Sequence, residues 1–230
     1  MIYITGDTHA DAKRLSSSSL KGLKRDDTLI ICGDFGFIWD DSPEEKKILK
    51  ELGSRDYDIC FIDGAHENFA LLDKYEASIW KKGKVHHICG RLYHLMRGQV
   101  FHIENKKIFC MGGGESPDAE IREESGSLTG REIPSQAELL EGAKNIEAAG
   151  FELDYIIAHE PPSRTKGFLH LDNSEPLAIT TLNTYFDEIV KHCKFQKLYF
   201  GSMHKDKLIS PTQTAIFKCI REAESGKELG

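Results

Sequence analysis

The chain has 230 residues, and its formal net charge of −7 lacks the basic excess of a protein that grips nucleic acid non-specifically. Hydrophobic residues make up 40% and charged residues 29%, as in a soluble globular protein, and no stretch approaches the roughly 20 apolar residues of a membrane-spanning helix. We therefore expect a single domain over residues 1–230, with no membrane association and no non-specific binding of nucleic acid.

The cysteines stand singly, mostly inside apolar runs, and none has the CxxC spacing of a zinc knuckle. This pattern is typical of reduced core thiols in a cytoplasmic protein rather than of a disulfide framework. The first residues form a strand-like run without a basic start and an apolar signal core, so we also expect no secretion signal.

Short runs rich in Ile, Val, Phe and Tyr predict strands. They cover Ile2–Thr5, Thr28–Cys32, Tyr57–Asp63, Val85–Cys89, Tyr93–Met96, Gln99–Glu104, Lys107–Met111, Leu153–Ala158, Lys197–Phe200 and Thr214–Cys219. Capping boxes predict one helix that starts at Ser42 and another that runs from Ser135 to Ala149. A third helix is expected over about Pro176–His192, a long loop or flap over 113–134, and a frayed tail over 222–230.

The order of these elements predicts an α/β fold. Strands that alternate with helices imply parallel strands with helices on both faces of a sheet. The closely spaced strands between residues 85 and 111, with a hairpin turn at Asn105-Lys106, indicate a second sheet or a mixed one.

Polar side chains follow several of these strands at the point where each strand ends. The segments are Gly6-Asp7-Thr8-His9, Gly33-Asp34, Gly64-Ala65-His66-Glu67, His159-Glu160 and Gly201-Ser202-Met203-His204. In open α/β sheets, ligands bind beyond the carboxyl ends of the strands, so we expect one polar cluster there. Imidazole and carboxylate together suit divalent Mn, Fe, Zn, Ni or Co, and a carboxylate can bridge two such ions.

These segments, in this order, resemble the five motifs of the calcineurin-like metallophosphoesterases over roughly residues 1–215. The resemblance implies a four-layered α/β/β/α sandwich with two mixed central sheets, and the metal site at the carboxyl ends of the strands. It implies that Asp7, His9 and His204 bind a first metal and that Asp34 bridges. His159 would then bind a second metal, and His66 would stabilise or protonate the leaving oxygen of a phosphate monoester or diester.

Two positions depart from the family pattern, which usually has Asn where this chain has Ala65 and His where it has Ser202. Both missing side chains would serve the second metal, so we expect one divalent metal (Mn, Fe, Zn or Ni) to bind firmly and the second to be weak or absent. The chain is then either a phosphatase or phosphodiesterase, with activity that this loss could impair. The alternative is a non-catalytic homologue that binds a phosphorylated ligand or a partner without turnover. Whether Ala65 and Ser202 are natural or engineered is left open.

Two further residues are candidates for substrate binding. Arg97 precedes Gly98 and could clamp a phosphate, although a structural salt bridge explains it equally well. Asn68 is the other candidate, and because Glu67 and Asn68 follow His66, a plain helix-cap region is the rival interpretation of the catalytic role of His66. The expected partner is a small phosphorylated substrate or a phosphodiester, and the sequence leaves the oligomeric state open.

Overall fold

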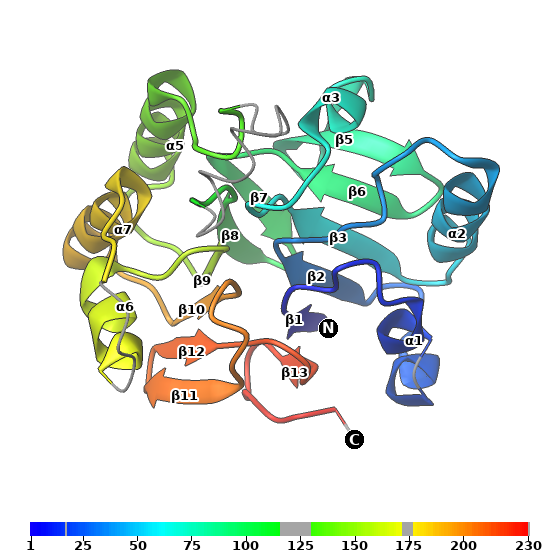
Figure 1. Ribbon diagram of the computed structural model, residues 1–230. Coiled ribbons are helices and arrows are strands. Elements are labelled where there is room, and N and C mark those ends of the chain that lie inside the picture. Colours follow the sequence, from blue (N-terminus) through cyan, green and yellow to red (C-terminus); the bar gives the residue numbers. More distant parts are fainter. Residues whose placement is uncertain (17, 116–129, 172–176, 230) are drawn as a thin grey trace.

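The computed structural model describes residues 1–16, 18–115, 130–171 and 177–229, and it contains two mixed β-sheets (Figure 1). The seven-stranded sheet has the order β13-β1-β2-β3-β6-β5-β4. Its strands are β1 (Ile2–Thr5), β2 (Thr28–Cys32), β3 (Asp58–Ile62), β4 (Ala77–Trp80), β5 (Gly83–Cys89), β6 (Leu92–Leu95) and β13 (Arg221–Glu222). The central strands β1, β2, β3 and β6 run parallel, whereas β13, β5 and β4 are antiparallel to their neighbours.

The six-stranded sheet has the order β11-β12-β10-β9-β8-β7. Its strands are β7 (Gln99–Ile103), β8 (Lys106–Met111), β9 (Tyr155–Ala158), β10 (Lys197–Phe200), β11 (Lys207–Ser210) and β12 (Gln213–Ala215). Strands β8, β9, β10 and β12 are parallel, and hairpin partners β7 and β11 close the two edges. Because both sheets have parallel strands at their centre, each collects several strand ends at one edge.

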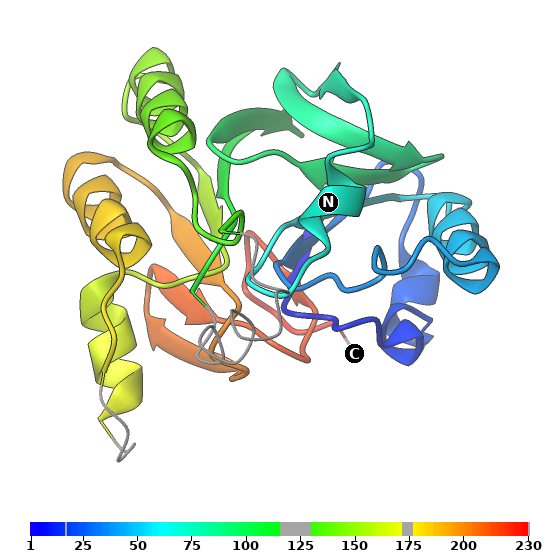
Figure 2. The same ribbon diagram turned by 45° about the horizontal axis from the view of Figure 1, so that its top comes forward.

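Helices cover the outer face of each sheet (Figures 1 and 2). Beside the seven-stranded sheet lie α1 (Ala12–Leu15), the 3-10 turn η1 (Ser18–Gly22), α2 (Pro43–Gly53) and α3 (Phe69–Leu72). Beside the six-stranded sheet lie α5 (Gln136–Ala148), α6 (Ser163–His170) and α7 (Thr181–His192). The predicted helix starts are confirmed at α2 and α5, where Ser42 and Ser135 accept the backbone N–H groups of Glu45 and Glu138.

Three hydrophobic clusters separate these elements. The cluster between the sheets contains residues of both, among them Ile30 and Ile157. The next residue along β2, Ile31, faces the other way into a second cluster with Leu49 of α2. A third cluster joins the six-stranded sheet to Phe186 of α7. The alternation along the strands thus places apolar side chains on both faces, and the order is helix, sheet, sheet, helix.

Several predicted boundaries differ from the structure by one or two residues, and two differ by more, each with a local cause. The strand expected over Thr214–Cys219 ends at Ala215, because the Asp206 carboxylate accepts the backbone N–H groups of the residues that follow, Phe217, Lys218 and Cys219. The helix expected from about Pro176 begins at Thr181, where Thr180 and Asn183 form a capping box. Residues 172–176 and most of the expected flap, 116–129, lie outside the described part of the chain.

The segment 222–229, where the sequence indicates a frayed tail, is packed in the structure. Glu222 belongs to β13, which pairs with β1, and the Ala223 N–H donates to the Ile2 carbonyl at 2.8 Å. Ala223 is fully buried between the sheets, and Leu229 packs against the cluster under α2. The expectation missed this packing because two small or apolar residues among charged ones give no periodic signal.

Candidate metal centre

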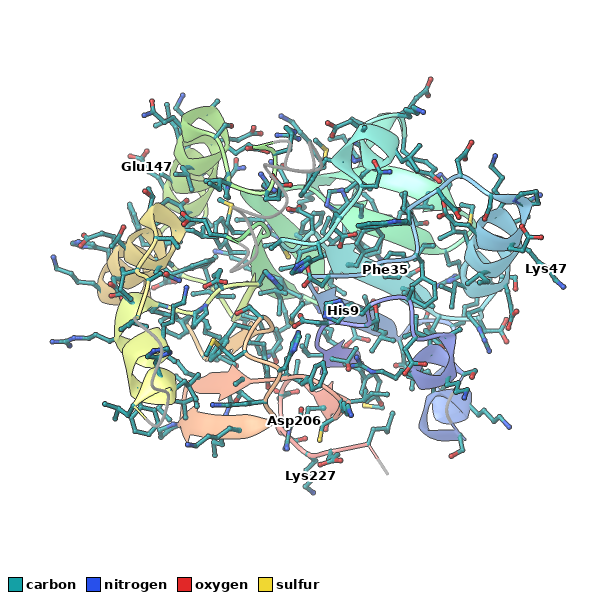
Figure 3. All side chains as sticks on the ribbon, in the orientation of Figure 1. His9, Phe35, Lys47, Glu147, Asp206 and Lys227 are labelled. Atoms are coloured by element: carbon teal, nitrogen blue, oxygen red, sulfur yellow. The ribbon has the colours of Figure 1, made fainter. Side chains whose placement is uncertain are left out.

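The strand ends of both sheets deliver Asp and His side chains to one place. Asp7, Asp34 and His66 follow β1, β2 and β3, whereas His159 and His204 follow β9 and β10. Figure 3 shows His9 near the centre of the molecule, between the two sheets, while Lys47 and Glu147 point outward on opposite flanks.

Four of these side chains form a group that could hold a metal ion. Ligand atoms of Asp7, His9, Asp34 and His204 all lie within 4.8 Å of one another. The Nε2 atoms of His9 and His204 are 3.1 Å apart, and His204 Nε2 lies 3.2 Å from Asp7 Oδ2. His9 Nε2 is 3.8 Å from Asp34 Oδ2. Two carboxylates and two imidazoles at such distances are the ligand set of a borderline divalent metal.

The backbone reaches this geometry through strained turns. His9, Asp34, Ser202 and His204 all have positive φ angles, between 42° and 48°. Such angles cost a non-glycine residue roughly 1–3 kcal/mol and persist only where the surroundings enforce them. Here the His9 N–H donates to the Asp34 carbonyl at 2.8 Å, which ties the first two loops together.

Two glycines leave room for the carboxylates. A Cβ atom at Gly64 would lie 2.0 Å from Asp34 Oδ1, and one at Gly201 would lie 2.1 Å from Asp7 Oδ1. Real Cβ atoms essentially never come so close to another heavy atom, so any side chain there would displace the ligand residues. The glycines of these motifs are therefore required by close approach.

Asp7 supplies the test of whether a metal fits. Its side chain is 0% exposed, yet neither carboxylate oxygen has a hydrogen-bond partner of good geometry among the described residues. A buried carboxylate without such bonds is costly, and its usual compensation is a cation. The donor set around Asp7 is that of a metal site, so the residues fit a divalent ion.

Both carboxylates are held ionised. Burial opposes the charge on Asp34, but the charge of His159 and the hydrogen bonds from His66 outweigh it and keep the pKa of Asp34 far below its usual range. Burial likewise opposes the charge on Asp7, and the nearby ring nitrogens of His159 and His204 lower the pKa of Asp7. Burial lowers the pKa of His9, which favours the neutral imidazole that binds metals.

His66 contacts Asp34 in two ways. Its backbone N–H donates to Asp34 Oδ1 at 2.8 Å, and its Nδ1 lies 3.1 Å from Asp34 Oδ2. An ionised carboxylate can only accept, so Nδ1 is assigned as the protonated ring nitrogen. The ring therefore has a set orientation beside the four-residue group.

The next residue, Glu67, supports the site in a way that sequence analysis missed. It is buried, and its carboxylate accepts the N–H groups of Phe35 at 2.7 Å and of Gly36 at 3.4 Å. Burial and the charge of Asp34 raise the pKa of Glu67 well above its ordinary value. The sequence signal was present, since a carboxylate directly after a motif histidine can reach the neighbouring strand-end loop.

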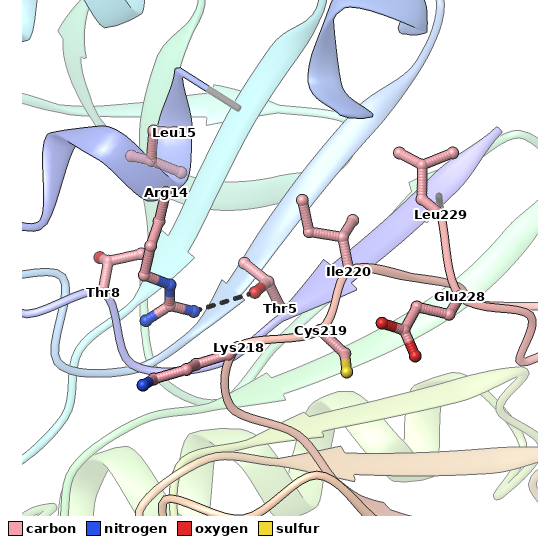
Figure 4. A pocket seen from close by; sticks show the side chains of 9 residues that line it. All are labelled: Thr5, Thr8, Arg14, Leu15, Lys218, Cys219, Ile220, Glu228 and Leu229. Carbon is pink, nitrogen blue, oxygen red and sulfur yellow. Dashed lines mark hydrogen bonds between the residues drawn. The ribbon is translucent and has the colours of Figure 1, made fainter. Parts of the chain in front are cut away.

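Arg14 is a second supporting residue that the sequence did not reveal. Its guanidinium donates to the carbonyls of Asp7, Gly6 and Phe217, and so it fastens the loop after β1. It also donates to Thr5 Oγ1 (Figure 4). It lines a pocket of about 220 Å³ with Thr5, Thr8, Leu15, Lys218, Cys219, Ile220, Glu228 and Leu229. None of the sequence-predicted metal residues lines this pocket, so Arg14 supports the metal loop from behind.

His159 lies beside the four-residue group rather than in it. Its Nδ1 is 3.1 Å from the Cys32 carbonyl and 3.5 Å from Asp7 Oδ1, and its Nε2 is 3.8 Å from Asp34 Oδ1. Burial opposes protonation, but Asp34 and Asp7 outweigh it and raise the pKa of His159 well above its ordinary value. Ala65 is buried, and Ser202 Oγ is a buried oxygen without a hydrogen-bond partner among the described residues.

The two residues suggested for substrate binding, Arg97 and Asn68, both have structural contacts. Arg97 is 6% exposed and forms a buried ion pair with Asp63, at 2.6 Å from its Nη2 to Oδ2, which is the salt-bridge alternative. Asn68 caps α3 by accepting the Leu71 N–H at 3.1 Å, and its Nδ2 donates to the Trp39 carbonyl at 2.6 Å. These contacts of Asn68 are those of a helix cap. The contacts described here for Arg97 and Asn68 do not direct a donor atom toward the metal group.

Fold and site together define an α/β protein with an Asp/His cluster that could hold a metal where two mixed sheets meet. A profile of the calcineurin-like phosphoesterases matches residues 1–194. The chain belongs to the calcineurin-like phosphoesterase family, which implies metal-dependent hydrolysis of phosphoesters. A comparison with curated proteins finds no significant match. Within the described residues, no helix combines the length and apolar character needed to cross a membrane.

Proposed function

We propose that this chain hydrolyses a phosphate monoester or diester, and that Asp7, His9, Asp34 and His204 hold the divalent metal. The observation that carries the proposal is the buried Asp7 carboxylate, which has no hydrogen-bond partner of good geometry among the described residues and lies beside three further ligand residues. Mn, Fe, Zn or Ni suits two carboxylates and two imidazoles. A bound divalent ion would supply charge stabilisation for the phosphoryl oxygens and an activated water as nucleophile.

His66 would act on the leaving group. Asp34 keeps the His66 ring oriented through Nδ1, at 3.1 Å, so Nε2 on the opposite edge is the atom that would protonate the leaving oxygen. Asp34 remains ionised because its pKa is lowered, and it can therefore stabilise the imidazolium form before transfer. Glu67 and Arg14 would keep the two metal loops in place through their bonds to backbone groups.

The proposed centre offers more ligand residues for a first metal than for a second. His159 is the remaining candidate ligand for a second metal, and Ala65 offers no side-chain donor. The buried Ser202 hydroxyl has no hydrogen-bond partner, but a neutral hydroxyl is a poor substitute for imidazole. We infer that one metal binds firmly and the second weakly or not at all. The same observation favours the second candidate function, a homologue that binds a phosphorylated ligand or partner without turnover.

The substrate and the surroundings are part of the proposal. The partner would be a small phosphorylated compound, because the net charge of −7 disfavours non-specific nucleic-acid binding. All six cysteines are free thiols in the structure, which supports a reducing compartment such as the cytoplasm.

An activity assay separates the two candidate functions. Purified protein would be tested with aryl phosphate monoesters and diesters in the presence of Mn²⁺, Ni²⁺, Zn²⁺ or Mg²⁺, beside an Asp34→Ala control. Turnover above the control with one of these metals is expected. Equal rates in both proteins with every metal would contradict hydrolysis and favour the binding role.

Elemental analysis tests how many metal ions the centre binds per chain. We expect about one metal per chain in the wild-type protein and a higher content in the double variant Ala65→Asn/Ser202→His. A rate that rises with the metal content would show that the second site is a damaged copy of the family's. Two firmly bound metals in the wild-type protein would contradict the inference.

A further inference from the structure

An exposed tryptophan lies next to the metal centre. Trp39 is 53% exposed, although the two residues before it, Phe37 and Ile38, are buried. Together with His9, Ala10, Gly36 and His66 it lines an open pocket of about 430 Å³. The pocket therefore has one wall formed by residues of the catalytic centre and another formed by an indole ring.

The backbone of Trp39 is held in place although its side chain is exposed. Its N–H donates to Glu45 Oε2 and its carbonyl accepts from Asn68 Nδ2, both at 2.6 Å. Asn68 is itself fixed as the cap of α3, and Glu45 lies in the first turn of α2. Two helices thus anchor this residue from both sides.

The segment that carries Trp39 also contacts the loops after β1 and β3, which carry His9 and His66. The Ala10 N–H donates to the Phe35 carbonyl at 3.1 Å, and a Cβ atom at Gly36 would lie 2.8 Å from the Ala10 nitrogen. Glu67 binds the N–H groups of Phe35 and Gly36 from the other side. These contacts therefore fix the backbone position of Trp39 relative to the metal group, as a substrate-binding wall requires.

The lining of the pocket indicates what it would accept. Among the described residues that line it there is no Lys or Arg, so it offers no clamp for a second phosphate. It offers an aromatic face and two imidazole rings, which suit a flat, uncharged group. Base–aromatic stacking contributes about 1–3 kcal/mol for each base and tolerates any planar ring system.

We propose that Trp39 selects phosphoesters whose leaving group carries a planar aromatic ring, either a nucleoside base or an aryl group. The ring stacks on the indole while the phosphoryl group faces Asp7, His9, Asp34 and His204. The inference rests on the proposed function for the location of the phosphoryl group. It assigns Trp39 to specificity, not to the chemical step.

Binding of phosphonates tests this without turnover, because their P–C bond is not hydrolysed. Benzylphosphonate and cyclohexylmethylphosphonate have the same head group and nearly the same size, and only the first is planar. The chain has two tryptophans, so a Trp80→Phe background leaves Trp39 as the fluorescent reporter. Trp80 stacks on Tyr93 at 4.9 Å, and phenylalanine retains an aromatic ring there.

With Zn²⁺ present, we expect benzylphosphonate to quench Trp39 and to bind at least about 5-fold more tightly than the cyclohexyl compound. Calorimetry on Trp39→Leu should show that this preference is lost, and on Trp39→Phe that part of it returns. Phe168→Leu is the matched control, since Phe168 is an equally exposed aromatic residue of α6 outside the pocket. The 5′-phosphonate analogue of adenosine monophosphate separates the two sources: tighter binding than benzylphosphonate indicates nucleosides, and weaker binding indicates aryl groups.

Equal affinities for the planar and the saturated phosphonate, or an unchanged preference in Trp39→Leu, would overturn the proposal, and Trp39 would then be a surface for protein contacts. Failure of the proposal about Trp39 can be distinguished from failure of the proposed hydrolysis. Metal-dependent turnover of phosphoesters without a planar preference contradicts only the role of Trp39. A Trp39-dependent preference in a protein without turnover contradicts only hydrolysis. Melting temperatures of the variants within about 2 °C of wild type would show that folding is intact.

Discussion

Two clusters of Asp and His lie close together in this molecule, and their buried carboxylates differ in hydrogen bonding. Asp7 is buried, and within the described part of the chain neither of its oxygens has a hydrogen-bond partner of good geometry. Asp63 is equally buried, but His94 Nε2 lies 3.0 Å from one of its oxygens and Arg97 Nε donates to the other at 2.8 Å. Arg97 also donates to the carbonyls of Arg131 and Glu132.

The difference distinguishes a structural polar network from a candidate ligand-binding site. Burial, charge and residue type are alike in both clusters, so none of them alone identifies the metal centre. Satisfaction of the polar atoms does identify it, because a folded protein ordinarily pairs every buried carboxylate. Asp63 is paired with Arg97 and His94, whereas the Asp7 oxygens face the ring nitrogens of His204 at 3.2 Å and His159 at 3.5 Å without good hydrogen-bond geometry. The Asp7 oxygens could therefore still bind a cation.

The largest effect is expected when the structural cluster is broken. Asp63→Ala leaves the Arg97 guanidinium buried without its main counter-charge, so the free energy of unfolding should fall by about 3–5 kcal/mol. Urea denaturation measures the change. In the double variant with Arg97→Met the loss should be smaller than the sum of the two single losses. Additive losses would mean that the pair does not act as a unit.

A substitution in the candidate metal cluster should reduce activity more than stability. Asp7→Asn removes a ligand charge, so the rate of phosphoester hydrolysis should fall at least about 100-fold and the metal content should drop. The substitution keeps the shape of the side chain, so the free energy of unfolding of the metal-free protein in EDTA should change by less than in Asp63→Ala. A loss as large as that of Asp63→Ala would show that Asp7 is mainly structural.

A pH titration of stability sharpens the comparison at the edge of the structural network. His86 Nδ1 lies 3.1 Å from His94 Nδ1, and burial, helped by the charge of His94, lowers the pKa of His86 from 6.5 to about 4. The unfolded chain binds the extra proton first, so stability should fall by about 1–2 kcal/mol as the pH drops from about 6.5 to 4. In His86→Phe this part of the slope should be absent. An unchanged slope would assign the pH dependence to other groups.

The smallest effect is expected at Asn68. Asn68→Ala removes the cap of α3 and should cost about 1 kcal/mol in the free energy of unfolding, measured by denaturation. Asn68→Asp is the control, because it keeps the oxygen that accepts the Leu71 N–H but loses the donor to the Trp39 carbonyl. Most of the stability should therefore return in Asn68→Asp. An alanine variant as stable as wild type would contradict the capping role.

Much of the metal cluster could be anticipated from the sequence, for a reason that lies in sheet geometry. Asp7 and Asp34 each follow glycine at the end of an apolar run, and parallel strands bring such ends to one edge. The contact of His204 with His9 follows once both sheets turn the same edge toward the centre. These are regular consequences of strand periodicity.

Long-range side-chain partners could not be anticipated in the same way. The sequence around Arg97 fits a phosphate clamp or an ion pair equally well until Asp63, which follows β3, is seen beside it. Asp206 ends a predicted strand by binding the N–H groups of a segment eleven and more residues later, and no local pattern announces this. The packing of Ala223 against Ile2 joins the last strand to the first and is equally invisible.

The contact between His9 and His204 has a consequence for the order of events during synthesis. Asp7, His9 and Asp34 are made at the beginning of translation and His204 nearly at the end, so roughly 10 to 40 seconds pass between them at ordinary ribosome speeds. Until β10 and the loop after it emerge, the first three residues can offer an ion only a partial cage. Firm loading with the proposed metal would thus be a late step that follows the approach of the two sheets.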